Sequence, residues 1–234
     1  MDRITHITFD AGGTLLYPYP SVGEIYAEYM GRHGLHLAPA CIEAAFSRTI
    51  KAAQSQTRMA VTDHDDKEWW RQVVAETIAD LGTVDDFDAL FEELWVAFAE
   101  PRYWRLFEGA ADTLAALKGQ GYQLAILSNW DKRLRTLLDG FGLSQYFTHV
   151  VISAEVGIEK PAAEIFQHTE RELATAPETI LHIGDSRRHD QAGAEAAGWQ
   201  WLLIDHGEGT STPDTLANLP ELLERLGGKG ARSQ

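Results

Sequence analysis

Four segments of this sequence contain polar side chains whose types and spacing could do chemistry. The segments are FDAGGTLL from Phe9, ILSNW from Ile126, GIEKPAAEIF from Gly157 and HIGDSRRHDQAGAEAAG from His182. Asp10 ends an apolar run and is followed by Gly12 and Gly13, and glycine serves where a backbone turns left-handed or lies against a ligand. A carboxylate can attack phosphorus when a cation neutralises the charge of the target. We therefore predict that Asp10 is a nucleophile that forms an aspartyl-phosphate.

A second carboxylate, Asp185, is the predicted partner of Asp10 in holding a divalent cation. It follows a later apolar run, and a parallel sheet would bring the ends of both runs to one edge. Mg²⁺ suits the pair because it takes oxygen ligands in octahedral geometry and keeps several waters. Asp190, further along the same segment, either orients a metal-bound water or Lys160, or caps a helix.

Lys160 and Ser128 are predicted to bind the oxygens of the phosphoryl group. Lys160 precedes Pro161, which fits the first position of a helix, and its ammonium can pair with both Asp10 and the phosphoryl group. The hydroxyl of Ser128 can donate to another phosphoryl oxygen, and backbone amides of residues 11–13 would complete an electrostatic clamp. The predicted catalytic residues are Asp10, Lys160 and Ser128. The predicted substrate-binding residues are Gly13, Thr14, Ser128, Asn129 and Lys160.

Five short apolar runs predict the strands that must position these residues. They are Ile4–Phe9, Gln123–Leu127, His149–Ile152, Ile180–Ile183 and Trp201–Ile204, and the helical patterns between the later runs are Gly109–Lys118, Lys132–Phe141, Ala162–Glu172 and Gln191–Ala197. Such alternation indicates a doubly wound parallel sheet with helices on both faces, an α/β fold of three layers. Sheets of this kind bind ligands beyond the carboxyl ends of their strands.

The connection after the first strand is too long for a short crossover and indicates an insertion. It contains four helical patterns, at about Val22–His33, Pro39–Gln56, Lys67–Leu81 and Asp85–Phe98, with breaks at Gly34, Thr62–Asp66 and Gly82. Four amphipathic helices can bury a core of their own as a bundle. We therefore expect a core domain of residues 1–16 and 102–234 and a helical cap of residues 17–101. The hinges are expected near residues 16–20 and 100–104.

Composition narrows the classes of partner. The chain has 234 residues and a formal net charge of −15, which argues against nucleic acid and anionic membranes as partners because both bind through basic patches. The single cysteine, Cys41, indicates a reducing context and is expected in the core. With no targeting segment or membrane span in view, we expect a soluble cytoplasmic protein, monomeric or homodimeric.

In order and spacing, the four segments resemble the four motifs of the haloacid dehalogenase-like hydrolase superfamily, and the insertion resembles its helical cap. The resemblance implies a Rossmann-like core and a Mg²⁺-dependent phosphatase acting on a small phosphorylated metabolite. It also implies that the metal is held by Asp10, Asp185 and the backbone carbonyl of Gly12. Most phosphatases of the superfamily have a second aspartate at the position of Gly12, where it protonates the leaving oxygen.

The glycine at position 12 leaves three readings open. The chain is a phosphatase that takes an acid from the cap or uses good leaving groups, a phosphate-binding relative with little turnover, or a dehalogenase or phosphonatase. The candidate cap acids are Tyr17, Tyr19, Glu24 and His33. Halide-displacing relatives typically have a tyrosine at position 12 and lack the acidic pair, whereas this chain keeps Asp185 and Asp190. Carbon–phosphorus cleavage would need a cap lysine such as Lys51 or Lys67, so we rank the phosphatase first.

Overall fold

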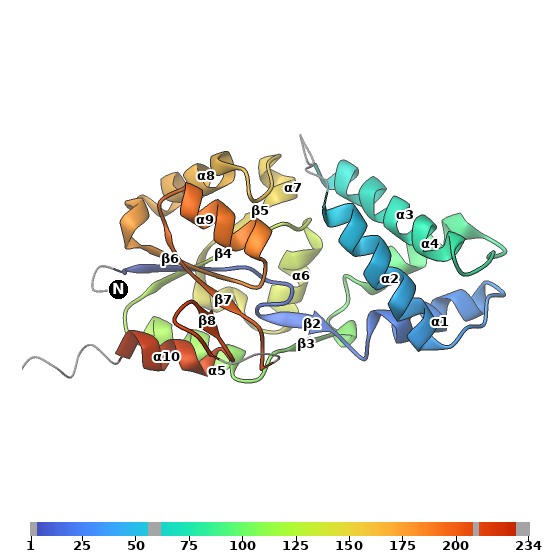
Figure 1. Cartoon of the computed structure of the whole chain (residues 1–234), viewed down its shortest axis with the longest axis horizontal. Coiled ribbons are helices and arrows are strands. Elements are labelled where there is room, and N and C mark those ends of the chain that lie inside the picture. Colours follow the sequence, from blue (N-terminus) through green and yellow to red (C-terminus); the bar gives the residue numbers. More distant parts are fainter. Residues whose placement is uncertain (1–3, 56–61, 208–210, 228–234) are drawn as a thin grey trace, which may run out of the picture.

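The computed structural model describes residues 4–55, 62–207 and 211–227, and its centre is a parallel sheet of six strands (Figure 1). The strands lie in the order β5, β4, β1, β6, β7 and β8, with the bounds Phe147–Ile152, Gln123–Ser128, His6–Phe9, Ile180–Gly184, Gln200–Ile204 and Thr215–Leu216. The five predicted strands are present and the doubly wound fold is confirmed. The two residues of β8 are too few for an apolar run to reveal.

The position of β1 in the sheet places the polar residues of three segments together. β1 pairs with β4 on one side and with β6 on the other, so Phe9 is in register with the ends of both neighbours. Connections leave these central strands toward opposite sides of the sheet, which makes this edge the topological switch point. Asp10, Ser128 and Asp185 stand at this edge because each lies at or just beyond the end of its strand.

Alternate side chains of the sheet pack against two layers of helices. Leu124 and Ile126 of β4 belong to an apolar cluster with one layer, whereas Ala125 and Leu127 belong to a cluster with the other. This alternation is the two-residue period of a strand, and it produces the three layers that were predicted. The first layer contains α5 (Ala110–Gly119), α6 (Arg133–Gly140) and α10 (Pro220–Gly227), and the second contains α8 (Ala163–Leu173) and α9 (Ala192–Ala196) (Figure 1).

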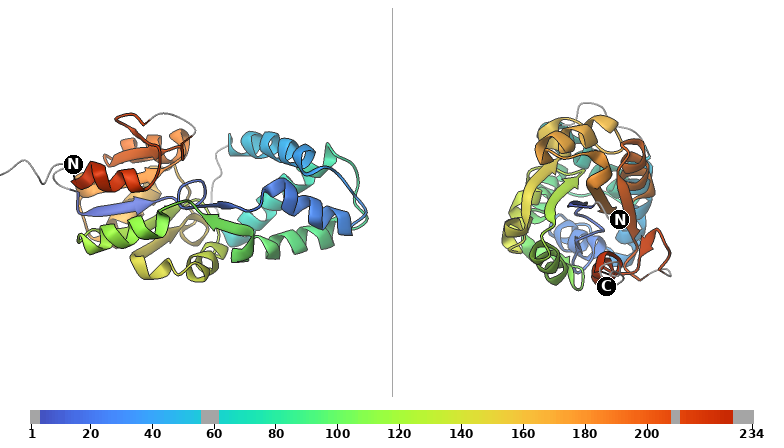
Figure 2. Two further views of the ribbon diagram at one scale, coloured as in Figure 1. Left: turned by 90° about the horizontal axis from the view of Figure 1, so that it is seen from below. Right: turned by 90° about the vertical axis from the view of Figure 1, so that its left-hand side faces the viewer.

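Helices α1 to α4 form a group at one end of the elongated molecule (Figures 1 and 2), with the bounds Val22–Arg32, Pro39–Gln54, Asp63–Ala79 and Phe87–Ala97. Each is buried along one face, as Leu90, Phe91 and Leu94 of α4 illustrate. The breaks predicted at Gly34 and Gly82 are present, and both glycines have positive φ. The predicted end of the second helix, Gln56, lies outside the described residues.

The third cap helix begins earlier than predicted. A break was expected over Thr62–Asp66, but α3 starts at Asp63. The cause is a capping box, in which the hydroxyl of Thr62 accepts from the backbone amide of Asp65 and the carboxylate of Asp65 accepts from the amide of Thr62. The polar run there is therefore a helix start rather than a loop.

Two short strands connect the helical group to the sheet. β2 (Leu16–Pro18) and β3 (Trp104–Leu106) pair in antiparallel fashion, with Leu16 opposite Leu106. They coincide with the segments predicted as hinges, and the sequence missed them because three residues carry too little periodicity. The domain boundaries at residues 16/17 and 101/102 remain our proposal.

One prediction about the core is wrong. Cys41 is exposed on α2, whose buried residues are its neighbour Ile42 and Ala45. The helical period explains the difference, because consecutive residues point about 100° apart and Ile42 takes the inward position. Within the described ranges, no helix is both long enough and apolar enough to cross a membrane.

Candidate active site

Asp10 lies at the end of β1 and is held from the next strand and from Lys160. The hydroxyl of Ser128, at the end of β4, donates to Asp10 Oδ1 at 2.9 Å, and Lys160 Nζ donates to the same oxygen at 2.8 Å. The backbone amide of Asp10 donates to Ile183 O of β6 at 2.8 Å. The carboxylate is thereby fixed through Oδ1, and neither of these bonds occupies Oδ2.

Lys160 is almost fully buried, at 1% exposure, and each of its three N–H groups has a partner. Nζ lies 2.8 Å from Asp10 Oδ1, 2.8 Å from Leu127 O and 2.6 Å from Asp190 Oδ1. Burial alone would lower the pKa of Lys160, but the carboxylates of Asp10 and Asp190 outweigh it and raise this pKa. Lys160 is therefore a fixed positive charge beside the predicted nucleophile.

Asp190 positions Lys160 and does not cap a helix. Its carboxylate accepts from Lys160 Nζ, from His182 Nε2 at 2.9 Å and from the backbone amide of Ser186 at 2.9 Å. The cap is Ser186, whose hydroxyl accepts from the amide of His189. Burial alone would raise the pKa of Asp190, but Lys160 and His182 hold it well below its usual range. Of the two roles weighed for Asp190, the structure supports the contact with Lys160.

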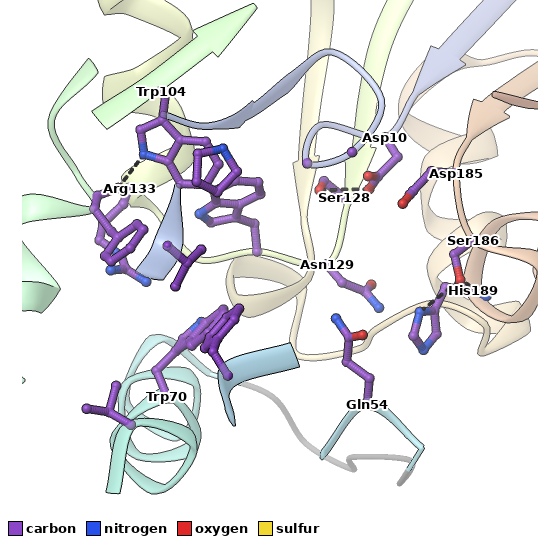
Figure 3. Close-up of a pocket in the computed structure, with 18 of the residues that line it drawn as sticks. Asp10, Gln54, Trp70, Trp104, Ser128, Asn129, Arg133, Asp185, Ser186 and His189 are labelled. Atoms are coloured by element: carbon purple, nitrogen blue, oxygen red, sulfur yellow. Dashed lines mark hydrogen bonds between the residues drawn. The ribbon is translucent and has the colours of Figure 1, made fainter. Parts of the chain in front are cut away.

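Asp185 lines the same cavity as Asp10 (Figure 3). It retains contact with solvent, and its partial desolvation, followed by the charges of Asp10 and Asp190, raises the pKa of Asp185 to about 7. The neighbouring Gly13 has φ +78°, and a Cβ on it would lie 2.5 Å from Asp185 Oδ2. Glycine at position 13 therefore serves both the left-handed turn and the close approach of the carboxylate.

The donor set fits a Mg²⁺ ion. Burial, followed by the charges of Asp10 and Asp190, raises the pKa of Asp185, so a cation would stabilise this site, and Gly12 lines the same cavity. No group of three His, Cys, Asp or Glu side chains suited to a metal occurs among the described residues. A site with so few protein ligands suits Mg²⁺, which is commonly bound through one or two carboxylates and keeps several waters.

A cavity of about 580 Å³ extends from this cluster toward the helical group. In Figure 3, Asp10, Asp185 and His189 lie at one end, and Trp70, Trp104 and Arg133 lie at the other. The predicted residues that line it are Asp10, Gly12, Gly13, Ser128, Asn129, Lys160, Asp185 and Asp190. The cavity therefore has a polar end at the sheet and an aromatic end beneath the helices.

Thr14 is the exception among the predicted substrate-binding residues. It is fully buried and does not line the cavity, because its amide turns back to Ala11 O at 3.3 Å. Its carbonyl accepts from His206 Nε2 at 3.0 Å on the side away from the cluster. The structure does not support a substrate contact from Thr14.

The space at position 12 is filled by an indole ring. A Cβ on Gly12 would lie 2.9 Å from Cζ3 of Trp130, a distance that real Cβ atoms essentially never show. Trp130 packs against Trp104 with ring centroids 5.2 Å apart. An aspartate side chain at position 12 would therefore need the indole to move. Sequence analysis missed Trp130, because only the fold brings the second motif against the first.

The candidate cap acids do not reach the cavity. Tyr17 packs on Phe107, Tyr19 is exposed, Glu24 bonds with Ser21, and His33 lies 3.4 Å from Glu93. None of them is among the described residues that line the cavity. The titratable lining residues that the sequence did not single out as acids are His189 and Tyr26. Burial lowers the pKa of His189 and raises that of Tyr26.

Comparison with known proteins gives a consistent family. The model of haloacid dehalogenase-like hydrolases matches residues 4–198. The chain is 33% identical over 207 residues to the Homo sapiens haloacid dehalogenase-like hydrolase domain-containing protein 3, covering 86% of this chain and 82% of that protein. It is 35% identical over 107 residues to a glyceraldehyde 3-phosphate phosphatase of Methanothermobacter thermautotrophicus, covering 43% of this chain and 45% of that protein.

A solved structure has the same fold. The Bacillus subtilis protein YfnB, described as a HAD-hydrolase bound to magnesium, superposes with a TM-score of 0.77 at 21% identity, covering 96% of this chain and 99% of that one. At this identity the likeness establishes the fold alone. The family model, which spans most of the chain, establishes more: this protein is a member of the haloacid dehalogenase-like hydrolase family.

Proposed function

We propose that the protein is a Mg²⁺-dependent phosphatase that hydrolyses a small phosphorylated metabolite through an aspartyl-phosphate at Asp10. The observation that carries the proposal is the position of this carboxylate. Its Oδ1 is bonded by Ser128 at 2.9 Å and Lys160 at 2.8 Å, and it stands beside Asp185 at the switch point of the sheet. An anionic nucleophile can approach an anionic phosphoryl group only where positive charge is supplied.

In the proposed reaction, an oxygen of Asp10 attacks phosphorus and the bond from phosphorus to the ester oxygen breaks. Lys160 stabilises the carboxylate and the charge that develops on the phosphoryl oxygens, and Asp190 keeps the ammonium in place. Asp10, Asp185 and the carbonyl of Gly12 would hold Mg²⁺, which neutralises phosphoryl charge when bound. Water then attacks the aspartyl-phosphate and releases inorganic phosphate, which restores Asp10.

Two findings support this choice over carbon–halogen cleavage. The relative in Methanothermobacter thermautotrophicus is named as a phosphatase, and YfnB is described as bound to magnesium. The choice is also supported by the charge of Asp10, which contributes to the raised pKa of Asp185, because a metal-free halide displacement does not need two such carboxylates. The net charge of −15 supports our expectation that neither nucleic acid nor an anionic membrane is a partner. A reducing, cytoplasmic setting remains our expectation from the single cysteine.

A second candidate is a phosphate-binding protein with little turnover. It is favoured by the indole of Trp130 at the place where an acid on residue 12 would stand. Such a protein would bind phosphate and Mg²⁺ through the same residues but release alcohols slowly, because general acid catalysis supplies roughly 10²- to 10⁴-fold in rate.

The experiment that tests the proposal measures phosphate release from acetyl phosphate and p-nitrophenyl phosphate with and without Mg²⁺. We expect turnover that needs Mg²⁺ and is abolished in Asp10→Asn, with Asp112→Asn, on the exposed side of α5, as the matched control. Mass spectrometry after an acid quench should detect a phosphorylated form of the wild type and of Asp112→Asn, but not of Asp10→Asn. Binding of phosphate without turnover would favour the second candidate, and metal-free chloride release from 2-chloropropionate would favour dehalogenation.

A further inference from the structure

We propose that the substrate is a phosphate monoester of a phenol-type alcohol, that is, an aryl phosphate with an uncharged aromatic leaving group. The inference rests on the proposed phosphatase function and adds the chemistry of the group that leaves. Three features of the cavity support it independently: its aromatic wall, the pairing of its cationic side chains, and the indole at position 12.

The end of the cavity away from Asp10 is built from aromatic side chains of both parts of the molecule. The lining residues there include Phe46, Trp70, Trp95, Phe98, Trp104 and Trp130. Trp104 and Trp130 come from the sheet side, and Trp70 comes from α3 opposite them (Figure 3). A cavity of about 580 Å³ with such a wall accepts a ring system, because aromatic faces pack well in offset or edge-to-face arrangements.

The cationic groups that line this cavity are already paired within the part of the chain that the structure describes. Arg133 donates to Asp131 Oδ1 and Oδ2 at 2.9 and 2.7 Å and to Trp95 O at 3.1 Å. Its guanidinium also lies 3.3 Å from the ring centroid of Trp95. Lys160 is enclosed at the polar end by three partners. Among the described residues, the charge of Arg133 at the aromatic end is offset by the carboxylate of Asp131, so we infer an uncharged leaving group.

Trp130 explains why the leaving oxygen should be phenolic. The indole occupies the space of an acid side chain at position 12, so residue 12 offers no proton to the departing oxygen. A phenol has a pKa of about 10, whereas water has one of about 15.7 and alkyl alcohols resemble water. A phenolate can therefore leave without being protonated, but an alkoxide leaves slowly.

The proposed reaction has two steps. Asp10 forms a bond to phosphorus while the bond from phosphorus to the aryl oxygen breaks, and the electron pair stays on the phenolate. The phenolate takes a proton from solvent. Water then attacks the phosphorus of the aspartyl-phosphate, its proton passes to solvent, and inorganic phosphate leaves with Asp10 regenerated.

Four phosphorylated compounds separate ring recognition from leaving-group ability. They are 1-naphthyl phosphate, benzyl phosphate, acetyl phosphate and glycerol 3-phosphate, assayed with Mg²⁺. We expect 1-naphthyl and benzyl phosphates to share a low KM, because both carry a ring. We expect kcat/KM for 1-naphthyl phosphate to exceed that for benzyl phosphate by about 10²-fold or more, because kcat/KM reports the step in which the leaving group departs and a missing acid slows the departure of an alkoxide.

Neighbouring tryptophans provide a matched pair of variants. Trp70→Leu removes a lining indole, whereas Trp69→Leu removes the adjacent one, which packs edge-to-face on Trp70 with ring centroids 4.9 Å apart and does not line the cavity. We expect Trp70→Leu to raise KM for 1-naphthyl phosphate about tenfold, the equivalent of one lost aromatic contact. Its KM for acetyl phosphate should stay unchanged, and Trp69→Leu should resemble the wild type with both substrates.

The outcomes distinguish this inference from the proposed function. Turnover of acetyl phosphate together with equal KM for 1-naphthyl phosphate and glycerol 3-phosphate would overturn ring recognition alone. Equal kcat/KM for 1-naphthyl and benzyl phosphates would overturn the phenolic leaving group, because an acid would then be supplied elsewhere. Turnover of none of the four would count against the phosphatase itself.

A binding measurement on the wild type tests whether the cavity recognises an aromatic ring, even if no substrate is turned over. Benzylphosphonate should bind about tenfold more tightly than ethylphosphonate by calorimetry with Mg²⁺ present, since only the first carries a ring. Equal affinities would refute an aromatic subsite. This readout also covers the case in which Trp70→Leu fails to fold.

Discussion

At the scale of residues, the site is defined by what stands at position 12 and by what holds Lys160. Trp130 and an acid on residue 12 compete for one volume, with 2.9 Å between a Cβ there and the ring. Lys160 is held by Asp10, Asp190 and Leu127 O, so the charge beside the nucleophile has little freedom. Lys160 reaches the cluster from the segment that precedes α8, whereas Trp130 follows the end of β4 by two residues.

We predict that Gly12→Asp alone does not improve hydrolysis of benzyl phosphate. The new side chain collides with Trp130, and such overpacking should lower the free energy of unfolding by about 1–3 kcal/mol. Combining it with Trp130→Ala makes room for the carboxyl group. The double variant should exceed Trp130→Ala in kcat for benzyl phosphate by about 10²-fold. A full gain in the single variant would show that the indole yields easily.

The sequence predicted the charged part of the site and missed its aromatic part. Asp10 and Asp185 could be predicted because polar residues at the ends of parallel strands meet at one edge. Lys160 could be predicted from its charge and its place before Pro161. Trp130 could not, because its role depends on the side-chain direction of one strand end relative to a turn far away in sequence. The contact of Asp190 with Lys160 was one of two options, and only the wide turn at Arg187–Gln191 decides between them.

At the scale of elements, short connections fix the turn that carries Gly12 and Gly13. His206, after β7, stacks on Phe107 with ring centroids 3.3 Å apart and donates from Nε2 to Thr14 O at 3.0 Å. The segment after β7 thus braces the turn after β1. Neither contact was predictable from apolar runs, because both residues lie outside them.

We predict that protonation of His206 lowers the free energy of unfolding in acid. Burial lowers the pKa of His206, so the unfolded chain binds a proton more readily than the folded protein does. The free energy of unfolding should therefore be fully present above about pH 6.5 and fall as the pH drops below it. Burial also lowers the pKa of His6 and His189, which adds to the same trend.

Urea titrations between pH 5 and 8 measure this slope, and the comparison uses His206→Gln. The variant should lose stability with falling pH less steeply than the wild type. His64→Gln, a change at an exposed histidine, is the control. An unchanged slope in His206→Gln would assign the acid sensitivity to other histidines.

The capping box of α3 gives a second prediction at this scale. Thr62→Ala removes the hydroxyl that accepts from the amide of Asp65. It should lower the free energy of unfolding by about 1 kcal/mol, the usual cost of losing a cap, and Thr62→Ser should restore it. Thermal unfolding followed by circular dichroism measures both. No difference between alanine and serine would mean that α3 does not depend on this cap.

At the scale of the whole molecule, the helical group and the sheet are joined unequally. One apolar cluster continues from the α5, α6 and α10 side of the sheet into α1 to α4, whereas the cluster with α8 and α9 contains no residue of these helices. On that second side, Arg188 Nη1 donates to Ser55 O at 2.5 Å. On the first side, Arg133 of α6 donates to Trp95 O of α4 at 3.1 Å.

We predict that the Arg133–Asp131 pair behaves as a buried ion pair. Arg133→Met leaves the buried carboxylate of Asp131 without its partner and should lower the free energy of unfolding by about 3 kcal/mol. The double variant with Asp131→Leu should recover most of the loss, because no unpaired charge remains. Calorimetry of the wild type, both single variants and the double variant measures the coupling. A double variant as unstable as Arg133→Met would assign the loss to the link with Trp95.

The unequal contacts between the helical group and the sheet determine where ligands enter and leave the cavity. Separating the helical group from the side of the sheet with α5, α6 and α10 would expose a continuous apolar cluster to water, which is unfavourable. On the side with α8 and α9, separation breaks the hydrogen bond from Arg188 to Ser55 O, which water can replace. We therefore expect the helical group to rotate about the β2–β3 ribbon and the apolar cluster beside it, so that the cavity opens on the side with α8 and α9. Ligands would enter and leave on that side, past Gln54 and His189 (Figure 3).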